Sequence, residues 1–338
     1  MTIRELAKAA GVSSATVSRM INKNGFVSKD ARARISAAMK AVGYHPANRH
    51  KQRGPKGSSS AFLKHRIFTM LWTSGTKHSL TSTGQEMMLG ITEALRPLGV
   101  SLLVDYIDSD NSIPKCLNNN KTDGLFLHGE PPGKPHSELI KKFPAVWLLQ
   151  AGGIEYGDRV QPDHRSIGVK AYQHLEEAGC KNVCCVSHSF SSIQPPYWYS
   201  REQGFTYAAK FGKTKCNVIH TKYSRHLGNT EKAFEAAVIA VDKFLSILPR
   251  PDGIFVANAM GAYVHSELKR RGIIPMKDVY MICGDLDSCG QFLDPDPVKI
   301  DIQGGQIGKL AVNAMLWRIK NPQMSKINHS VESLLMYP

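Results

Sequence analysis

A short run near the start of the chain, Gly11 to Lys23, carries small and hydroxylated side chains where an exposed helix usually carries long charged ones. Its members that could do chemistry are Ser13, Ser14, Ala15, Thr16, Ser18, Arg19 and Asn22. Hydroxyls donate and accept hydrogen bonds, and a guanidinium can bond a guanine edge or a phosphate. Small side chains also let a helix lie close to the bases in a DNA major groove about 12 Å wide. We interpret this face as one shaped to contact DNA, and a helical hairpin that contacts only protein is the alternative.

The positive charge of the chain is concentrated at the same end. The formal net charge is +15, and residues 1–66 hold 14 Lys or Arg against Glu5 and Asp30, which places +12 there and only +3 in the remaining 272 residues. No Asp or Glu occurs between residues 31 and 85. A surface that only needs to be soluble mixes the two signs, so this basic end indicates a polyanionic partner, and nucleic acid fits best.

Three short helices are predicted to position the run. The first spans residues 2–10, with Thr2 as its N-cap and Glu5 three residues on, and Gly11 ends it. The second begins at Ser13, and the third spans about 28–42, before Gly43. Their predicted inward faces consist of Ile3, Leu6, Ala7, Ala10, Val17, Met20, Ile21, Ala31, Ile35, Ala38, Met39 and Val42. Two helices joined by a tight glycine turn and braced by a third form a helix-turn-helix domain.

The rest of the chain has a different pattern. Residues 45–66 are rich in Pro, Gly, Ser and positive charge, which is typical of a linker. From Ile67 onward, short apolar strands alternate with amphipathic helices, which predicts parallel, doubly wound sheets. About 270 residues are more than one such layer usually holds. We therefore predict an all-α headpiece over residues 1–44, a basic hinge or linker over 45–66 and a two-lobed α/β body over 67–338.

Other chemistries have little support in the sequence. Residues 180–188 hold three cysteines and a histidine, but the stretch is predicted as a strand, whose neighbouring side chains point to opposite faces and cannot gather round a metal. The triplet GKT, Gly212 to Thr214, lacks the glycine that a phosphate-binding loop needs five residues earlier, since Tyr207 stands there. No Ser or Cys has a convincing base and orienting acid. We predict no metal, no cofactor and no enzymatic activity.

The cysteines and the hydropathy bear on the compartment. The seven cysteines are odd in number and irregular in spacing, which argues against a secreted disulfide framework. No apolar run approaches the roughly 18 residues that a membrane span needs, and the first residues lack a signal-peptide pattern. We expect a cytoplasmic protein that has no membrane partner.

The sequence TIRELAKAAGVSSATVSRMINKNGFVSKDARARISAAMKAVGYHP, which starts at Thr2, resembles the headpiece of the lactose-repressor (LacI/GalR) family of bacterial transcription regulators. The resemblance implies that Ser13, Ser14, Ala15, Thr16, Ser18, Arg19 and Asn22 fall on positions that contact bases or phosphates in the family. It also matches Ser28 and Arg32 to the start of the family's third helix. With Thr2 at the first cap, these three residues complete the headpiece part of the predicted DNA surface.

The resemblance continues more thinly through residues 162–187, REQGF at Arg201 to Phe205, residues 251–287 and residues 300–319. It implies the fold of periplasmic sugar-binding proteins, in which two lobes are joined by three crossovers and an effector binds in the cleft. On this basis we expect lobe 1 at about 67–158 plus 291–318, and lobe 2 at about 159–290 plus 319–338.

The hinge departs from the family pattern. Family hinges usually form a short helix on the operator and wedge a leucine into the minor groove. This chain has PANRHKQRG, which places Lys51 at the usual arginine and Arg53 at the leucine, and Gly54 and Pro55 limit any helix there. Because a narrow minor groove attracts arginine electrostatically, we predict that Lys51 and Arg53 anchor the hinge by charge, with less kinking of the DNA.

The predicted effector site gathers at the carboxyl ends of strands, where ligands of α/β lobes bind. The candidates are Trp72, Thr73, His128, Glu130, Gln150, Trp198, Asn258 and Asp285. Trp72 and Trp198 have the alternative of being simply core or rim aromatic residues. The resemblance identifies Arg201 and Asn258 with the family's effector-binding arginine and asparagine, whereas Asp285 and Asp287 both fit its acidic position. Ala259 stands where the family commonly has Asp. Planar polar groups and an indole suit a sugar or another polyol.

These features together predict a homodimeric DNA-binding regulator, most often a repressor in the family that it resembles. Two headpieces are expected to dock in successive major grooves of a near-palindromic operator, and a small sugar-like effector to switch the affinity. The alternative is an enzyme that acts on a small sugar and carries a fused headpiece. The sequence leaves open the effector, its sign as inducer or corepressor, and the operator. No heptad helix follows the body, so tetramers by that route are not expected.

Overall fold

The computed structural model describes residues 3–22, 25–41, 62–74, 81–107, 112–149, 156–190, 196–222, 230–284 and 293–338. The chain divides into two compact units, Met1–Ser58 and Ser59–Pro338. The division falls within the predicted linker, most of which lies outside the described residues.

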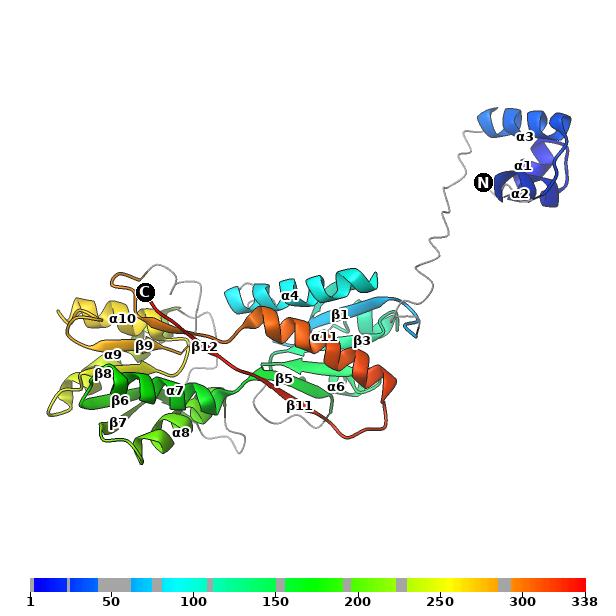
Figure 1. Ribbon diagram of the computed structural model, residues 1–338. Coiled ribbons are helices and arrows are strands. Elements are labelled where there is room, and N and C mark those ends of the chain that lie inside the picture. Colours follow the sequence, from blue (N-terminus) through cyan, green and yellow to red (C-terminus); the bar gives the residue numbers. More distant parts are fainter. Residues whose placement is uncertain are drawn as a thin grey trace. The chain divides into compact units, whose positions relative to one another are not determined.

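The first unit contains three helices, α1 (Ile3–Ala9), α2 (Ser14–Asn22) and α3 (Lys29–Ala41) (Figure 1). Gly11 makes the turn between α1 and α2 with a φ of +60°, a backbone conformation that glycine adopts at little cost. The core holds Leu6, Ala7, Ala10, Val17 and Ile35, with Val12, Met20, Ile21, Ala38 and Met39 packed around it. The predicted helix-turn-helix domain is therefore confirmed, together with the inward faces of its helices as far as they are described; the side chain of Ile3 and the whole of Val42 lie outside the described residues.

The second unit contains two six-stranded sheets. The first has the order β11-β5-β4-β3-β1-β2, and all its neighbouring strands are parallel. Its strands are β1 (Ile67–Trp72), β2 (Ser101–Tyr106), β3 (Gly124–His128), β4 (Ala145–Leu148), β5 (Asp158–Pro162) and β11 (Asn328–Val331). The elements that go with it are α4 (Ser82–Leu95), the 3-10 turn η2 (Arg96–Leu98), α5 (Lys115–Asn118), α6 (His136–Ile140) and α11 (Gly304–Lys320).

Helices cover both faces of this sheet because its strands are apolar on both. Phe68 and Met70 of β1 pack with α4 and α11 on one face, whereas Leu71 packs with α5 and α6 on the other. Near-continuous apolar strands of this kind are typical of parallel sheets. The pair α4 and α11 is closely packed, since a Cβ at Gly90 would lie 2.1 Å from the carbonyl oxygen of Gly305.

The second sheet has the order β12-β10-β9-β8-β6-β7, parallel except for the antiparallel pair β10 and β12. Its strands are β6 (Asn182–Ser189), β7 (Lys215–Lys222), β8 (Gly253–Val256), β9 (Tyr280–Cys283), β10 (Val298–Asp301) and β12 (Leu334–Met336). α7 (His164–Glu177) and α8 (Tyr197–Ala209) cover one face, and α9 (Thr230–Ser246) and α10 (Gly261–Arg270) cover the other. The predicted architecture of two doubly wound lobes is confirmed.

Three segments cross between the lobes: β5 to α7 at residues 162–164, β10 to α11 at 301–304, and β11 to β12 at 331–334. The crossovers are bonded to one another. The backbone N–H of Asp163 donates to the carbonyl of Val331 at 3.0 Å, and the side-chain amide of Gln303 donates to the carbonyl of Glu332. Lys170 pairs with the Glu332 carboxylate at 2.7 Å and donates to the carbonyl of Ser333 at 2.8 Å. The junction is one hydrogen-bonded assembly.

The expected lobe boundaries need correction at the C-terminal crossovers. The assignment of 291–318 to lobe 1 and 319–338 to lobe 2 is wrong for two strands, because β10 belongs to the second sheet and β11 to the first. Both strands are four residues long and carry polar side chains, VKID and NHSV, so their sequence gives no sign of which sheet they complete. None of the described helices is long and apolar enough to cross a membrane.

Candidate functional site

One face of α2 presents the side chains that the sequence assigns to DNA contact. The exposed or partly exposed residues of this face are Ser14, Ala15, Thr16, Ser18 and Arg19. Val17, on the opposite side, is fully buried in the core of the headpiece. One face of α2 therefore packs against the headpiece core, and the other faces solvent. The solvent-facing side has no bulky side chain in its first turn.

Two serines of the predicted DNA surface are helix caps. Ser13 Oγ accepts a hydrogen bond from the backbone N–H of Thr16 at 3.2 Å and lies 2.8 Å from Thr16 Oγ1. Ser28 Oγ accepts from the backbone N–H of Ala31 at 3.3 Å and caps α3 in the same way. These bonds fix where each helix begins.

The turn that follows α2 positions Arg19. Gly25 has a φ of +100°, and a Cβ there would lie 3.5 Å from Arg19 Cδ, so the arginine stem runs along this turn. Arg32 is exposed in the first turn of α3. Thr2, Lys51 and Arg53 lie outside the described residues, as does the side chain of Asn22, the last residue of α2.

The carboxyl edges of the two sheets face the junction between the lobes. β5 runs parallel to its neighbours and leads at Pro162 directly into the second lobe, so the first sheet ends its strands toward that lobe. β10 runs parallel to β9 and leads at Asp301 directly into the first lobe. Side chains at both edges therefore line the region where a ligand between the lobes would bind.

On the first lobe, the structure brings together four of the predicted effector residues. Trp72 and His128 are partners in the register of β1 and β3, and their rings meet edge to face at 5.1 Å between centroids. The hydroxyl of Thr73 donates to the His128 carbonyl at 3.1 Å, and the His128 ring is bonded through Nδ1 to the Leu148 carbonyl at 3.0 Å. Glu130 is exposed just beyond β3. The indole N–H of Trp72 is buried and has no partner among the described residues.

On the second lobe, Arg201 is the centre of a buried polar cluster. Its side chain is 1% exposed and lies on α8. Nη1 donates to the carbonyls of Ala257 at 3.0 Å and Gly284 at 3.1 Å, which follow β8 and β9, and Nε donates to His164 Nδ1 at 3.3 Å. The guanidinium also lies 4.7 Å from the centre of the Tyr197 ring. A positive charge is thus held at the carboxyl edge of the second sheet, where the family resemblance places it.

His164 is a member of this cluster that the sequence did not reveal. It is the first residue of α7, directly after the first crossover, and it is buried. Burial and the adjacent Arg201 charge lower the pKa of the His164 imidazole well below its ordinary value, so the ring is neutral. The one sequence feature that could have pointed to His164 is its place directly after β5, because the chain passes from the first lobe to the second at residues 162–164.

Asn258 lies beside the same cluster, immediately after Ala257. Its Oδ1 accepts from the backbone N–H of Met260 at 3.1 Å, and its side chain is 2% exposed. Its Nδ2 has no hydrogen-bond partner in the part of the chain that the structure describes. The structure therefore places Asn258 next to a residue that Arg201 bonds, whereas Gln150, Asp285 and the rival Asp287 lie outside the described residues.

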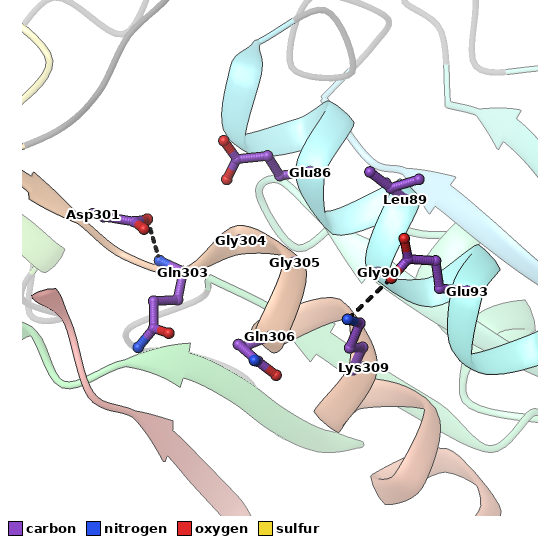
Figure 2. Close-up of a pocket in the computed structure, with 10 residues that line it drawn as sticks. All are labelled: Glu86, Leu89, Gly90, Glu93, Asp301, Gln303, Gly304, Gly305, Gln306 and Lys309. Atoms are coloured by element: carbon purple, nitrogen blue, oxygen red, sulfur yellow. Dashed lines mark hydrogen bonds and ion pairs between the residues drawn. The ribbon is translucent and has the colours of Figure 1, made fainter.

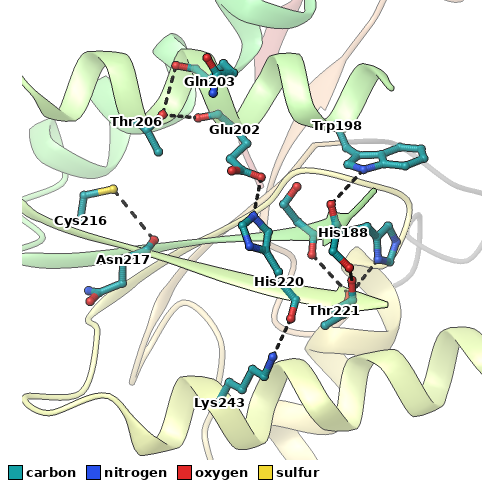
Figure 3. A network of polar contacts seen from close by, with 12 residues as sticks. His188, Trp198, Glu202, Gln203, Thr206, Cys216, Asn217, His220, Thr221 and Lys243 are labelled. Carbon is teal, nitrogen blue, oxygen red and sulfur yellow. Dashed lines mark hydrogen bonds and ion pairs between the residues drawn. The ribbon is translucent and has the colours of Figure 1, made fainter. Parts of the chain in front are cut away.

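Trp198 is fixed by a polar network in the second lobe (Figure 3). Its indole N–H donates to the carbonyl of His188 at 3.2 Å, and the His188 ring is bonded to Thr221 Oγ1 at 2.8 Å. One turn of α8 further on, Glu202 pairs with His220 of β7 at 2.9 Å. Because these bonds tie α8 to β6 and β7, they hold the helix that carries Arg201. Trp198 is 7% exposed and Trp72 is fully buried, which favours the alternative that both are core aromatic residues.

A hollow that the sequence did not predict lies beside the second crossover (Figure 2). It has a volume of about 330 Å³ and is formed by α4, the end of β10 and the start of α11. Glu86 faces Asp301 there, and burial together with the Asp301 charge raises the pKa of the Glu86 carboxyl. Glu93 and Lys309 close one side with an ion pair of 3.0 Å. None of the predicted effector residues lines this hollow.

The described residues contain no group of three or more His, Cys, Asp or Glu placed to hold a metal ion. Cys184 and Cys185 are free, fully buried thiols on neighbouring positions of β6, and they pack into opposite faces of the second lobe. Burial raises the pKa of the Cys180 thiol to about 11, which keeps it protonated and unreactive at neutral pH.

Two family profiles match the chain. Residues 2–47 match the one described as bacterial regulatory proteins, lacI family, and residues 172–335 match the periplasmic binding protein-like domain. Among curated proteins, the ribose operon repressor of Escherichia coli strain K12 is 24% identical over 99% of this chain and 98% of its own length. The HTH-type transcriptional repressor PurR of Vibrio cholerae is 24% identical over 95% of this chain and 92% of its own length.

Solved structures share the fold over the whole chain. The transcriptional regulator CelR in complex with cellobiose is 19% identical, with a TM-score of 0.64, and covers 100% of this chain and 98% of its own. The lac repressor dimer bound to operator and the anti-inducer ONPF is 17% identical, with a TM-score of 0.63 and the same coverage.

Proposed function

We propose that the chain is a transcription repressor of the lacI family of bacterial regulatory proteins, which binds a specific operator and is switched by a small polar effector. One observation carries the proposal. The helix that follows the glycine turn is buried on its Val17 side and presents small, hydroxylated and basic side chains on the other. A helix with these properties suits the major groove of DNA.

The proposed DNA contacts follow from exposure and chemistry. Ser14, Ala15 and Thr16 in the first turn of α2 approach the base edges, and Arg19 takes a guanine or a phosphate. Ser13, Ser18, Ser28 and Arg32 lie within reach of the DNA backbone, and the family pattern adds Asn22 and Thr2. Lys51 and Arg53 follow in the hinge. Two headpieces of a homodimer then read half-sites about one helical turn apart, so the operator is near-palindromic.

The proposed effector site lies between the carboxyl edges of the two lobes. Its candidate residues are Trp72, Thr73, His128, Glu130, Gln150, Trp198, Arg201, Asn258 and Asp285. A sugar or sugar derivative is supported by the ribose repressor among the relatives and by the cellobiose complex among the similar structures. To change operator occupancy from nearly full to nearly empty, the effector needs about 5 kcal/mol of differential affinity for the two arrangements of the lobes.

The relatives are repressors and not enzymes, and the buried cysteines offer no activated nucleophile, so we propose a ligand that is bound and released unchanged. A repressor of this kind acts where bacterial DNA is, in the cytoplasm. An enzyme fused to the headpiece would instead convert the ligand, which chromatography of the ligand before and after incubation would detect.

The test is selection of an operator from random duplexes with the full-length chain, followed by titration of the winning duplex. We expect enrichment of an inverted repeat. Arg19→Ala should weaken binding by about 1–3 kcal/mol, roughly 5- to 150-fold, as is usual for a lost base contact. Arg250→Ala removes the same charge from an exposed position of the body and serves as the matched control.

Two results would contradict the proposal. The first is an absence of any enriched sequence after repeated rounds, with or without sugars present. The second is an equal loss of affinity in the Arg19 and Arg250 variants, since a general charge effect would then account for the binding and the α2 face would have no special role.

A further inference from the structure

The imidazole of His164 offers a hydrogen-bond donor that nothing in the described structure accepts. Nε of Arg201 can only donate, so at 3.3 Å it makes His164 Nδ1 the acceptor. The single proton of the neutral ring therefore sits on Nε2. This atom is buried and has no partner among the described residues. A buried donor left unsatisfied destabilises the site, which is a strong reason for a ligand atom to accept from it.

A second donor of the same kind lies close by. Asn258 Oδ1 is engaged by the N–H of Met260, so the free end of the amide is its NH₂ group. That nitrogen is also buried without a partner in the described part of the chain. Arg201 joins the two positions, because it bonds His164 directly and bonds the carbonyl of Ala257, the residue before Asn258.

Two carbonyl oxygens at this place already accept hydrogen bonds from a charged donor. Those of Ala257 and Gly284 both accept from the Arg201 guanidinium. A ligand hydroxyl could satisfy the two donors, but it would bring no negative charge to the Arg201 guanidinium. A carboxylate has acceptor oxygens only, and its charge is opposite to that of Arg201.

We propose that the effector is a carboxylic acid whose carboxylate accepts hydrogen bonds from His164 Nε2 and Asn258 Nδ2 beside the Arg201 guanidinium. The inference rests on the proposed function, since it names the chemical class of the ligand of that same site. A site of this kind binds sugar acids and related small acids more tightly than neutral sugars. His164 is the residue that makes the selection, because it adds a donor to an arginine that alone would also hold neutral oxygen groups.

The test compares acids with their neutral parents on the full-length protein at neutral pH. The pairs are D-gluconate with D-glucose, D-galacturonate with D-galactose and D-ribonate with D-ribose, each titrated by calorimetry. We expect at least one acid to bind 10-fold or more tightly than its parent. Equal or tighter binding of a parent overturns the inference, and so does the failure of all three acids to bind at about 10 mM, far above a useful effector affinity.

Two variants assign the selection to its residues. His164→Phe keeps a ring and removes the donor, and we expect the acid to bind roughly 10- to 100-fold more weakly, as for a lost bond to a charged group. Asn258→Asp replaces the NH₂ donor with a carboxylate that repels the acid, and its effect is read separately if the first variant does not fold. His174→Phe, on the same helix but bonded to Tyr280, is the matched control and should change the affinity less than twofold. Unchanged acid binding in both site variants would overturn the assignment.

The two proposals fail in different ways. If an acid binds through His164 but leaves operator affinity unchanged, the ligand class stands and the regulatory function fails. If an operator is found and a neutral sugar switches it, the function stands and the ligand class fails.

Discussion

Replacing Gly90 with alanine tests whether contact between α4 and α11 stabilises the first lobe. The added Cβ would lie 2.1 Å from the carbonyl oxygen of Gly305, against an ordinary contact of 3.4 Å or more. The obstacle is backbone on both sides, so no side chain can rotate away. The helices must separate by more than 1 Å at this point, next to a second close approach in which a Cβ at Gly308 would lie 2.3 Å from the carbonyl of Met87.

The cost follows from the loss of that packing. Overfilling a packed interior usually costs about 1–3 kcal/mol, and a backbone obstacle places this substitution at the upper end, so we expect the free energy of unfolding to fall by about 3 kcal/mol. Urea unfolding followed by tryptophan fluorescence measures it, because Trp72 and Trp147 are fully buried in this lobe.

The control is Gly133→Ala, in the same lobe, where an added Cβ meets nothing within 4 Å. This variant should unfold within about 0.5 kcal/mol of the wild type. If Gly90→Ala unfolds at the same urea concentration as Gly133→Ala, the close contact of α4 and α11 does not contribute to stability and the reasoning is refuted.

Three further predictions concern pH, salt and the hinge. Burial lowers the pKa of His188 to about 4, below its ordinary value of 6.5, so the folded protein binds fewer protons than the unfolded chain between these values. The contribution of His188 to stability is therefore complete above about pH 6.5 and is lost as the pH falls toward 4, at no more than about 1.4 kcal/mol per pH unit. Urea titrations across this range should show that the free energy of unfolding depends less steeply on pH in His188→Gln than in the wild type. Operator affinity should fall with salt at a log–log slope of about −0.9 per phosphate neutralised, and Arg32→Ala should reduce the slope by about one; a slope near zero would exclude the basic face as the binding surface. Arg53→Leu should increase the bend of the operator in a gel-mobility bending assay, and a wild-type bend as sharp as that of the variant would show that Arg53 already acts as a wedge.

The headpiece was predictable because its determinants are local. The turn at Gly11, the caps at Ser13 and Ser28 and the apolar spacing of Leu6, Val17 and Ile35 are all read within a few residues. The central strands were predictable for a similar reason, since parallel strands buried on both faces are continuous apolar runs. Trp72 and His128 were placed together by the rule that parallel strands end at one edge, and the register of β1 and β3 has them as partners.

The missed elements depend on contacts between distant parts of the chain. β5 reads DRVQP and looks like a loop, yet Asp158 is fully buried because Arg318, far along the sequence, binds its carboxylate at 2.6 Å and 2.9 Å. His164 escaped notice for the same reason, since its partner Arg201 lies on another helix. Short motifs identify a residue's type and neighbours, but they do not reveal a partner that only the folded chain brings near.

The interleaved order of the last strands also sets the sequence of events during synthesis. The first sheet needs α11 and β11, and the second needs β10 and β12, so the first lobe cannot be completed before residue 331 has left the ribosome, nor the second before residue 336. The headpiece is complete by residue 41. At about 5–20 residues per second, a nascent chain carries a finished DNA-binding domain for roughly 15–60 s before its regulatory body can close.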